Sequence, residues 1–288
     1  RMKLLKKILF VFLIIFAAIG VAFTAVFFGM RLGIFNVRGS IDERNAFFET
    51  GNPPRGNIAE AAIRTCENDI ATVCAWNETA EWHTVLSGLE KDAEIIARVS
   101  EETGVPERVL VSVVIPEQLR FFSANREVFK RYFEPLKILG SLTQFSLGIS
   151  GIKEETAQAI ERYAKDPSSP RFPVTAYLPL IAYSTSVNVP TERIARLTDA
   201  KNHYYQYLYT AVAIRELEAE WNSVGHPIYG RADILATLFN IGFEHSRPHE
   251  NPQSGGAPIT IGNKTYTYGD LAQLFYASDE GIELFPIK

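Results

Sequence analysis

One carboxylate, Glu117, stands at the end of an apolar segment, where a protein can make a general acid. Residues 109–116 are apolar except for Ser112, and Glu117 follows them directly. A helix that is apolar around most of its circumference is usually buried, so we expect Glu117 to lie at the edge of the core. Burial disfavours the charged carboxylate, which predicts a raised pKa and acid–base function near neutral pH. The alternative is a surface glutamate paired with Arg120.

Pro116 precedes this carboxylate and predicts where the helix changes direction. Proline removes one backbone hydrogen bond and clashes with the preceding turn, so it kinks or ends a helix. We therefore expect Glu117 to lie on a bend at the end of its helix.

The rest of the chain is dominated by helical periodicity, with one short hairpin. Two β-prone segments flank Gly262 and Asn263, which predicts a hairpin over 259–268. No internal repeat or second-domain boundary is visible, so the sequence predicts one mainly helical domain with a small β-hairpin near its C-terminus. Helices are expected over 57–73, 78–102, 106–120, 125–138, 153–165, 174–186, 191–222, 230–240 and 269–278.

The N-terminal segment has the pattern of a membrane anchor. Residues 8–28 contain no charged side chain and approach the length of about 20 residues that spans a bilayer. Four basic residues before them favour a cytoplasmic N-terminus and contact of the anchor with lipid: Arg1, Lys3, Lys6 and Lys7. The predicted organisation is a tail and anchor over 1–30, a stalk or loop over 31–56, and an exported domain over 57–288.

The charge balance and the two cysteines fit an exported domain. With four of the 29 Lys and Arg in the tail, 25 remain against 33 Asp and Glu, a balance of −8. Such a surface has little attraction for nucleic acid. Cys66 and Cys74 are suited to one small-loop disulfide in an oxidising compartment. The alternative is a continuous helix, which would hold the two thiols too far apart to bond.

Other polar clusters point to no metal ion or cofactor. His245 and His249 are four residues apart, but Pro248 breaks the helix that would place both rings on one face. The chain also has no nucleophile elbow and no phosphate-binding loop. We therefore expect neither a bound metal nor a cofactor.

Three segments together carry a family resemblance. Glu117 ends its apolar helix, residues 146–157 place a glycine-containing loop before a helix, and residues 239–242 close a later helix. This order resembles the lytic transglycosylases with a goose-type lysozyme fold, which cleave peptidoglycan, over roughly residues 104–243. The loop matches the family's Ser-x-Gly-Leu-Met-Gln-Ile-x-Pro-x-Thr-Ala pattern at Ser146, Gly148, Ile152, Thr156 and Ala157.

The same segments also depart from the family's pattern. In the loop, Ser150, Gly151 and Glu154 stand where the family has methionine, glutamine and proline, and Gln118 replaces the serine that usually follows the catalytic glutamate. In the last segment, Asn240 and Gly242 agree with the family's Tyr-Asn-Ala-Gly pattern, whereas Phe239 and Ile241 do not. The resemblance is to a divergent member.

The resemblance implies a lysozyme-like fold and a reaction that needs one carboxylate. Glu117 would protonate the oxygen between N-acetylmuramic acid and N-acetylglucosamine, and would then take the proton from the muramoyl C6 hydroxyl as a 1,6-anhydro ring closes. Asn240 would donate to an acetamido group and accept from a sugar hydroxyl. The implied substrate-binding residues are Ser146, Gly148, Ser150, Gly151, Asn240 and Gly242.

The resemblance also implies a location and leaves two other functions open. A peptidoglycan enzyme with this anchor would lie in the cytoplasmic membrane of a bacterium, with its domain in the periplasm or outside the cell. One alternative is an inactive glycan-binding or scaffold protein of an envelope assembly. The other is a hydrolase that uses Glu154 or Glu155 as a second carboxylate.

Overall fold

The computed structural model describes most of the expected domain. The described residues are 76–121, 149–173, 177–199, 201–242, 246–261 and 264–287, with position 244 and scattered positions between 10 and 24. Two predicted helices, 57–73 and 125–138, lie outside these residues, as do Cys66 and Cys74, Ser146 and Gly148.

The described part is mainly helical with one two-stranded sheet, which confirms this level of the predicted fold. Its elements, in chain order, are α4 (Ala80–Lys91), α5 (Ala93–Thr103), α6 (Glu107–Phe121), α8 (Glu154–Tyr163), α9 (Leu178–Ile181), α10 (Val189–Thr198), α11 (Tyr204–Ser223), α12 (Ala232–Ile241), β1 (Pro258–Ile261), β2 (Lys264–Thr267) and α13 (Tyr268–Ala277).

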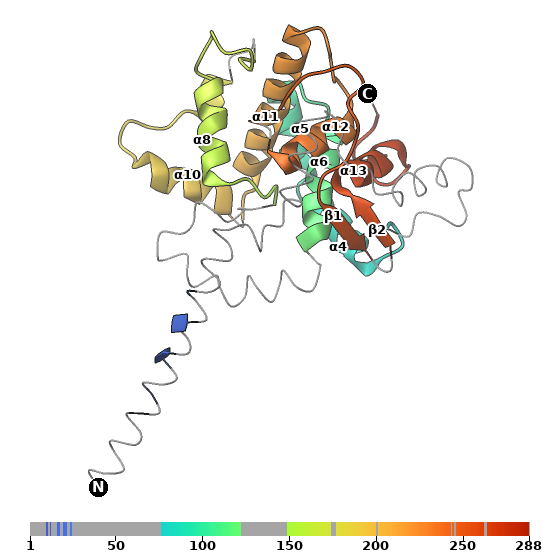
Figure 1. The fold of residues 1–288 in the computed structure, drawn as a ribbon, viewed down its shortest axis with the longest axis horizontal. Coiled ribbons are helices and arrows are strands. Elements are labelled where there is room, and N and C mark those ends of the chain that lie inside the picture. The colour runs from blue at the N-terminus through green and yellow to red at the C-terminus, as the bar shows by residue number, and fades with distance from the viewer. Residues whose placement is uncertain are drawn as a thin grey trace.

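Helices α6 and α11 lie in the middle of the described domain (Figure 1). Helix α11 packs against α5, α6 and α8, and α6 also packs against α12 and α13. Both central helices are buried on nearly every side, which explains why neither has a strongly polar face. On one side α8 and α10 cover α11 (Figure 1), and on the other the hairpin packs against α6 and α13.

The apolar helix α6 continues through its proline. Every residue from Val109 to Ile115 is buried, as predicted, but the helix runs past Pro116 to Phe121. The predicted bounds of 106–120 are therefore confirmed to within one residue at each end, whereas the expectation that Glu117 ends the helix is wrong. Packing on several sides of α6 holds the helical path, although the proline removes one backbone hydrogen bond.

Two predicted long helices are each divided in the structure. The segment 78–102 breaks at Asp92, whose carboxylate lies 2.7 Å from His203 Nδ1 and accepts a hydrogen bond from the Tyr207 hydroxyl at 3.0 Å. The segment 191–222 breaks after α10, where Asp199 Oδ1 accepts hydrogen bonds from the backbone amides of Lys201 and Asn202. The bonds of Asp199 to the backbone compete with helix continuation, whereas those of Asp92 go to side chains of distant residues.

The hairpin and the last helix follow the sequence pattern closely. Ile259 pairs with Tyr266 and Ile261 pairs with Lys264 across the two strands. Ile259, Ile261 and Tyr266 are buried, so one face of the hairpin packs on the core. The predicted helix over 174–186, by contrast, appears in the described residues only as the four-residue α9.

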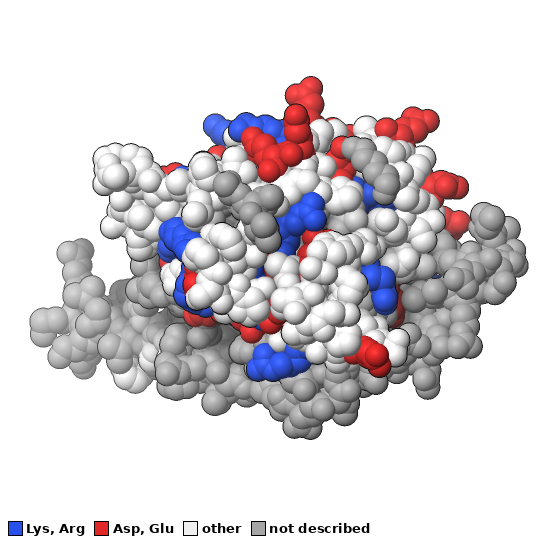
Figure 2. Space-filling model, turned by 90° about the horizontal axis from the view of Figure 1, so that it is seen from above, with Lys and Arg blue, Asp and Glu red and all other residues white. Residues whose placement is uncertain are grey.

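Charges of both signs are mixed over the face seen in Figure 2, and acidic side chains gather along its upper edge. The predicted membrane anchor, 8–28, falls almost wholly outside the described residues. Within the part that is described, no helix is both long and apolar enough to cross a membrane.

A buried carboxylate joins the helices on one side of α11. Glu161 of α8 accepts hydrogen bonds from Arg193 of α10 at 2.8 and 2.7 Å, and from the hydroxyls of Tyr183 and Tyr209 at 2.6 Å each. Burial alone would raise the pKa of Glu161, but these hydrogen bonds outweigh it and lower the pKa. Glu161 therefore contributes stability above its unfolded pKa, and the contribution is lost as the pH falls through the folded pKa.

Glu216 of α11 is buried without such partners. Neither of its carboxyl oxygens has a hydrogen-bond partner among the described residues, and burial raises the pKa of Glu216 well above its ordinary value. The pH dependence of its contribution to stability is therefore opposite to that of Glu161. This contribution is fully present below the unfolded pKa of Glu216 and is lost as the pH rises above that value.

These two carboxyl groups give a paired prediction. At pH 7, Glu161→Gln should lower the free energy of unfolding by about 3 kcal/mol, because the buried Arg193 loses its closest counter-charge and keeps only Glu154, at 3.4 Å. Glu216→Gln should instead raise the free energy of unfolding at pH 7, because glutamine has no charge to lose on burial. Urea unfolding between pH 3 and pH 8 should show both differences shrinking toward the acid end. If both variants changed the free energy of unfolding in the same direction at pH 7, the opposite pKa shifts of Glu161 and Glu216 would be contradicted.

Candidate active site

Glu117 is buried and ion-paired. Its side chain lies in the third turn of α6 and the residue is only 5% exposed, which confirms the predicted burial. Arg120 Nη2 lies 2.5 Å from Glu117 Oε2, and the Tyr268 hydroxyl donates to the same oxygen at 3.5 Å. Pairing with Arg120 is therefore also correct, but it occurs in the interior and not at the surface.

The carboxylate opens into a small pocket that several distant segments form. The pocket has a volume of about 20 Å³, little more than one water molecule needs. Its described lining comes from α6, from the loop before α8 and the start of α8, from the end of α12 and from the start of α13: Glu117, Arg120, Ser150, Gly151, Ile152, Thr156, Phe239, Asn240 and Tyr268. Predicted site residues from three segments thus meet at one place.

Two glutamines hold the loop against the helices. Gln118 Nε2, next to the carboxylate on α6, donates to the carbonyl of Ile149. The Ile149 amide donates to Gln206 Oε1 of α11 at 2.6 Å, and the Ser150 hydroxyl donates to the Gln206 carbonyl at 3.3 Å. The residue that departs from the family's serine, Gln118, therefore has a defined structural task here.

The backbone of Gly151 lies directly against the carboxyl group of Glu117. A Cβ atom at this position would lie 2.6 Å from both Cδ and Oε1 of Glu117, far inside contact distance. The φ angle of Gly151 is +64°, which side chains other than glycine rarely adopt. The position is therefore restricted to glycine for two independent reasons.

Asn240 lines the pocket from the end of α12. Its Oδ1 accepts a hydrogen bond from the Ala257 backbone amide at 2.8 Å, which fixes the orientation of the carboxamide. Its Nδ2 has no hydrogen-bond partner among the described residues, although Asn240 is only 5% exposed. Asn240 Oδ1, which was expected to accept from a sugar hydroxyl, therefore already accepts from the Ala257 amide. Nδ2 remains as a donor for a sugar acetamido group.

The structure separates one predicted residue, Gly242, from this group. Gly242 ends α12 with a φ of 113° and donates to the Leu238 carbonyl, but it is not among the described residues that line the pocket. Ser146 and Gly148 lie outside the described residues. Gly242 therefore acts as a helix end in the described structure.

Sequence reasoning missed two residues at the site. Tyr268 reaches Glu117 from the first residue of α13, and Gly256, with a φ of +96°, lies so close to Asn240 that a Cβ would be 2.9 Å from Oδ1. Two successive glycines, 255 and 256, are typical of a loop, but no local pattern indicates that Gly256 packs on Asn240.

The described lining contains one carboxylate and one guanidinium, so the two charges balance. Within the described part of the chain, no three His, Cys, Asp or Glu side chains lie together in a group that could hold a metal ion. The arrangement is suited to proton transfer by one carboxyl group, with a neutral hydrogen-bond donor nearby.

Comparisons with protein-family models, with curated proteins and with solved structures find no match for this chain. The function must therefore be argued from the site itself.

The contact between Gly151 and Glu117 predicts a large energetic coupling. Gly151→Ala should lower the melting temperature, because it forces a positive φ on alanine and drives Cβ into the carboxyl group. Combining it with Glu117→Ala removes the collision, so the double variant should be more stable than additivity predicts by at least about 1 kcal/mol.

Gly88→Ala is the matched control for that measurement. Nothing lies within 4 Å of a Cβ at Gly88, which is inside α4, so alanine should stabilise there by about 0.5 to 1 kcal/mol. If the stability changes caused by Gly151→Ala and Glu117→Ala were simply additive, the loop at Gly151 would not be in contact with the Glu117 carboxyl group.

Asn240 should have separable effects on stability and on binding. Asn240→Ala leaves the buried Ala257 amide without an acceptor and should cost about 1 to 3 kcal/mol in thermal unfolding. Asn240→Asp keeps the acceptor and should cost less. Both variants lose the Nδ2 donor and should bind glycan fragments more weakly by calorimetry. Unchanged binding by the Asp variant would remove Asn240 from the site.

Proposed function

We propose that this chain is a membrane-anchored lytic transglycosylase with a lysozyme-like domain, acting on peptidoglycan. The observation that supports this most strongly is the meeting of Glu117, Gly151 and Asn240 at one pocket. These residues come from three segments separated by more than 30 and more than 80 positions, in the order that the family resemblance implies.

The proposed reaction uses Glu117 twice. In its neutral form it donates a proton to the glycosidic oxygen, and the bond to the muramoyl anomeric carbon breaks. As a carboxylate it then accepts the proton of the muramoyl C6 hydroxyl while that oxygen closes the 1,6-anhydro ring. The proton balance needs no second acid, and Glu117 is the single carboxylate in the described lining.

Arg120 and the surrounding core have opposite effects on the protonation of Glu117. Burial favours the neutral acid that starts the reaction, whereas the ion pair with Arg120 favours the carboxylate that completes it. Asn240 Nδ2 supplies a donor for an acetamido oxygen of the sugar. A sugar must enter by widening the small pocket, because about 20 Å³ does not hold a sugar ring.

A glycan-binding or scaffold function is the second candidate. The resting ion pair between Glu117 and Arg120 and the small volume of the pocket both favour it. A two-carboxylate hydrolase has less support. Glu154 hydrogen-bonds to Gln158 and pairs with Arg193, and neither Glu154 nor Glu155 is among the described lining residues.

Mass spectrometry of purified peptidoglycan after incubation with the full chain separates these functions. We expect 1,6-anhydro-muropeptides; reducing ends would indicate the hydrolase, and unchanged sacculi that sediment with the protein would indicate the scaffold. Glu117→Gln should lower the rate by about 10² to 10⁴. Glu155→Gln, the same change on an exposed glutamate of α8, should leave it unchanged.

The loss of activity must be distinguished from loss of fold. Glu117→Gln removes the carboxylate that pairs with the buried Arg120, which is destabilising. The double variant with Arg120→Met removes both charges and should recover most of the thermal stability while staying inactive. Recovery of cleavage by the double variant would show that Glu117 is not the acid.

The anchor at residues 8–28 is the other part of the proposal. It would hold the chain in the cytoplasmic membrane with the domain on the exported side, where peptidoglycan lies. Protease added to intact spheroplasts should digest the domain. Protection that ends only when the membrane is lysed would reverse the topology.

A further inference from the structure

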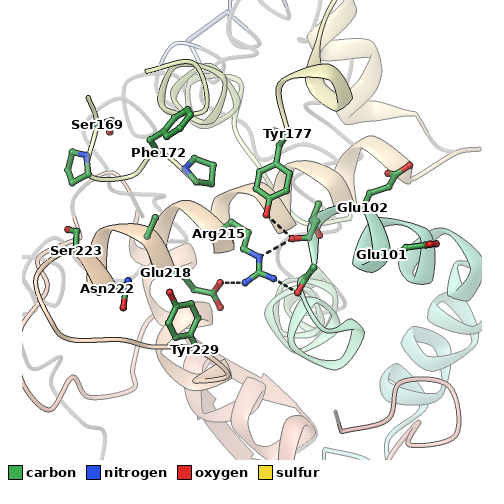
Figure 3. Close-up of a pocket in the computed structure, with 15 residues that line it drawn as sticks. Glu101, Glu102, Ser169, Phe172, Tyr177, Arg215, Glu218, Asn222, Ser223 and Tyr229 are labelled. Atoms are coloured by element: carbon green, nitrogen blue, oxygen red, sulfur yellow. Dashed lines mark hydrogen bonds and ion pairs between the residues drawn. The ribbon is translucent and has the colours of Figure 1, made fainter. Parts of the chain in front are cut away.

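A second and much larger cavity lies along α11, apart from Glu117. Its volume is about 700 Å³, within the range of ligand pockets. Its described lining comes from the end of α5, from the segment 169–177, from the C-terminal half of α11 and from Tyr229 (Figure 3). None of these lining residues is shared with the Glu117 pocket, so a ligand here would not occupy the candidate active site.

The floor of the cavity is a row of side chains on one face of α11. Residues 218, 219 and 222 follow Arg215 by three, four and seven positions, which places all of them on the same side of the helix. At 1.5 Å per residue the row is about 10 Å long, which is similar to the length of a disaccharide.

The two charged groups in this row neutralise each other. Arg215 donates from Nη1 to Glu218 Oε2 at 2.7 Å, and its other two nitrogens donate to the carbonyl groups of Thr103, at 3.0 Å, and Gly104 (Figure 3). The guanidinium is therefore committed to partners within the protein and is not available to an anion. Because Arg215 offsets the charge of Glu218, the row does not favour a cation either.

The other carboxylates of the described lining are remote from this part of the cavity. Glu101 and Glu102 lie on the far side of Arg215 from Asn222 and Tyr229 (Figure 3). A ligand between Arg215 and Tyr229 therefore lies over a neutral floor, which favours an uncharged ligand.

Two polar groups of the row remain for such a ligand. Glu218 is only 4% exposed, and its Oε1 makes no hydrogen bond with a described residue, whereas Oε2 is held by Arg215. The Asn222 carboxamide, one helical turn further on, likewise makes no hydrogen bond with a described residue. A carboxylate oxygen accepts from a hydroxyl, and a carboxamide both donates and accepts. The two groups therefore suit a ligand that is rich in hydroxyls.

The walls of the cavity are aromatic. Phe172 and Tyr229 lie on either side of the row in the view of Figure 3, and Tyr229 is 55% exposed, so its ring is accessible to a ligand. The C–H groups of a pyranose ring form an apolar face that packs on an aromatic ring, while the hydroxyls at its edge bond to neighbouring polar groups. Aromatic walls beside a carboxylate and a carboxamide provide both kinds of contact.

We infer that this cavity binds a short, uncharged segment of a β-1,4-linked sugar chain. One ring stacks on Tyr229 and places its hydroxyls at Glu218 Oε1 and the Asn222 carboxamide. Successive rings of such a chain expose opposite faces, so the next ring can pack toward Phe172 on the other side of the row. This site is additional to the one at Glu117 and does not depend on the reaction proposed there.

Calorimetric titration of the full chain with chitotetraose and with cellotetraose tests this inference. We expect saturable binding whose affinity does not change with added salt, because screening does not act on an uncharged ligand. Tyr229→Ala should weaken the binding about five- to tenfold, whereas Tyr229→Phe, which keeps the ring, should weaken it less than about threefold. Asn222→Ala should weaken it about two- to tenfold.

Val224→Ala is the matched control. Val224 is 56% exposed at the end of α11 and is not among the described lining residues, so its truncation should leave the affinity unchanged. Tyr229 and Asn222 are exposed as well, so none of these variants removes a buried contact.

Three results would overturn the inference. They are the absence of saturable binding of both sugars, equal weakening by Val224→Ala and Tyr229→Ala, and binding that Asn240→Asp abolishes but Tyr229→Ala leaves unchanged. The third result would place the sugar at the Glu117 pocket. Release of anhydro-muropeptides tests the reaction at Glu117 separately, so the two proposals can fail independently.

Discussion

The position of the candidate active site depends on one buried arginine. Arg108, in the first turn of α6, donates to carbonyl groups at and beyond the end of α13: those of Phe275, Tyr276, Ser278, Glu280 and Phe285. The last carbonyls of a helix have no partner within the helix, and a cation there also interacts favourably with the helix dipole. Arg108 is completely buried, so this contact ties α6 to α13 inside the core.

This contact sets the relation between the two helices that form the site. Arg108 lies about 13 Å before Glu117 along α6, and Tyr268 lies about 12 Å before Tyr276 along α13, at 1.5 Å per residue. The two helices are antiparallel and are joined at Arg108. Because the segment from Arg108 to Glu117 is nearly as long as the segment from Tyr276 back to Tyr268, the Tyr268 hydroxyl lies beside the carboxylate of Glu117. On the other side of the domain, the bonds of Glu161 to Arg193, Tyr183 and Tyr209 hold α8 and α10 against α11, behind the loop that carries Gly151.

The sequence predicted those features that local pattern determines. The apolar run of α6, the hairpin and α13 all appear where periodicity and turn residues placed them. The breaks at Asp92 and Asp199 were missed, because a helical pattern continues through both and the competing bonds come partly from distant residues such as His203 and Tyr207. The predicted helix over 106–120 agrees with α6, but the local preference of Pro116 for a helix end misplaced that end at Glu117, because packing outweighed this preference.

The candidate site divides in the same way. Burial of Glu117 follows from its own segment, and the nearness of Gly151 and Asn240 followed only from the family resemblance. Other features depend on tertiary neighbours that no local pattern encodes. They are the orientation of the Asn240 amide, the contact of Tyr268 with Glu117, and the hydrogen bond from the Ile149 amide to Gln206. The ion pair with Arg120 was visible as a spacing of three, but only the structure shows that it is buried.

The most direct test of this account is a crystal structure of the Glu117→Gln variant with a peptidoglycan glycan fragment. We expect a glycosidic oxygen within about 2.6 to 3.2 Å of the residue 117 side chain, as proton transfer requires. We also expect Asn240 Nδ2 to donate to an acetamido oxygen of the same sugar. A fragment bound only elsewhere on the domain, with the pocket between Gly151 and Asn240 still closed, would contradict the assignment of Glu117 as the acid.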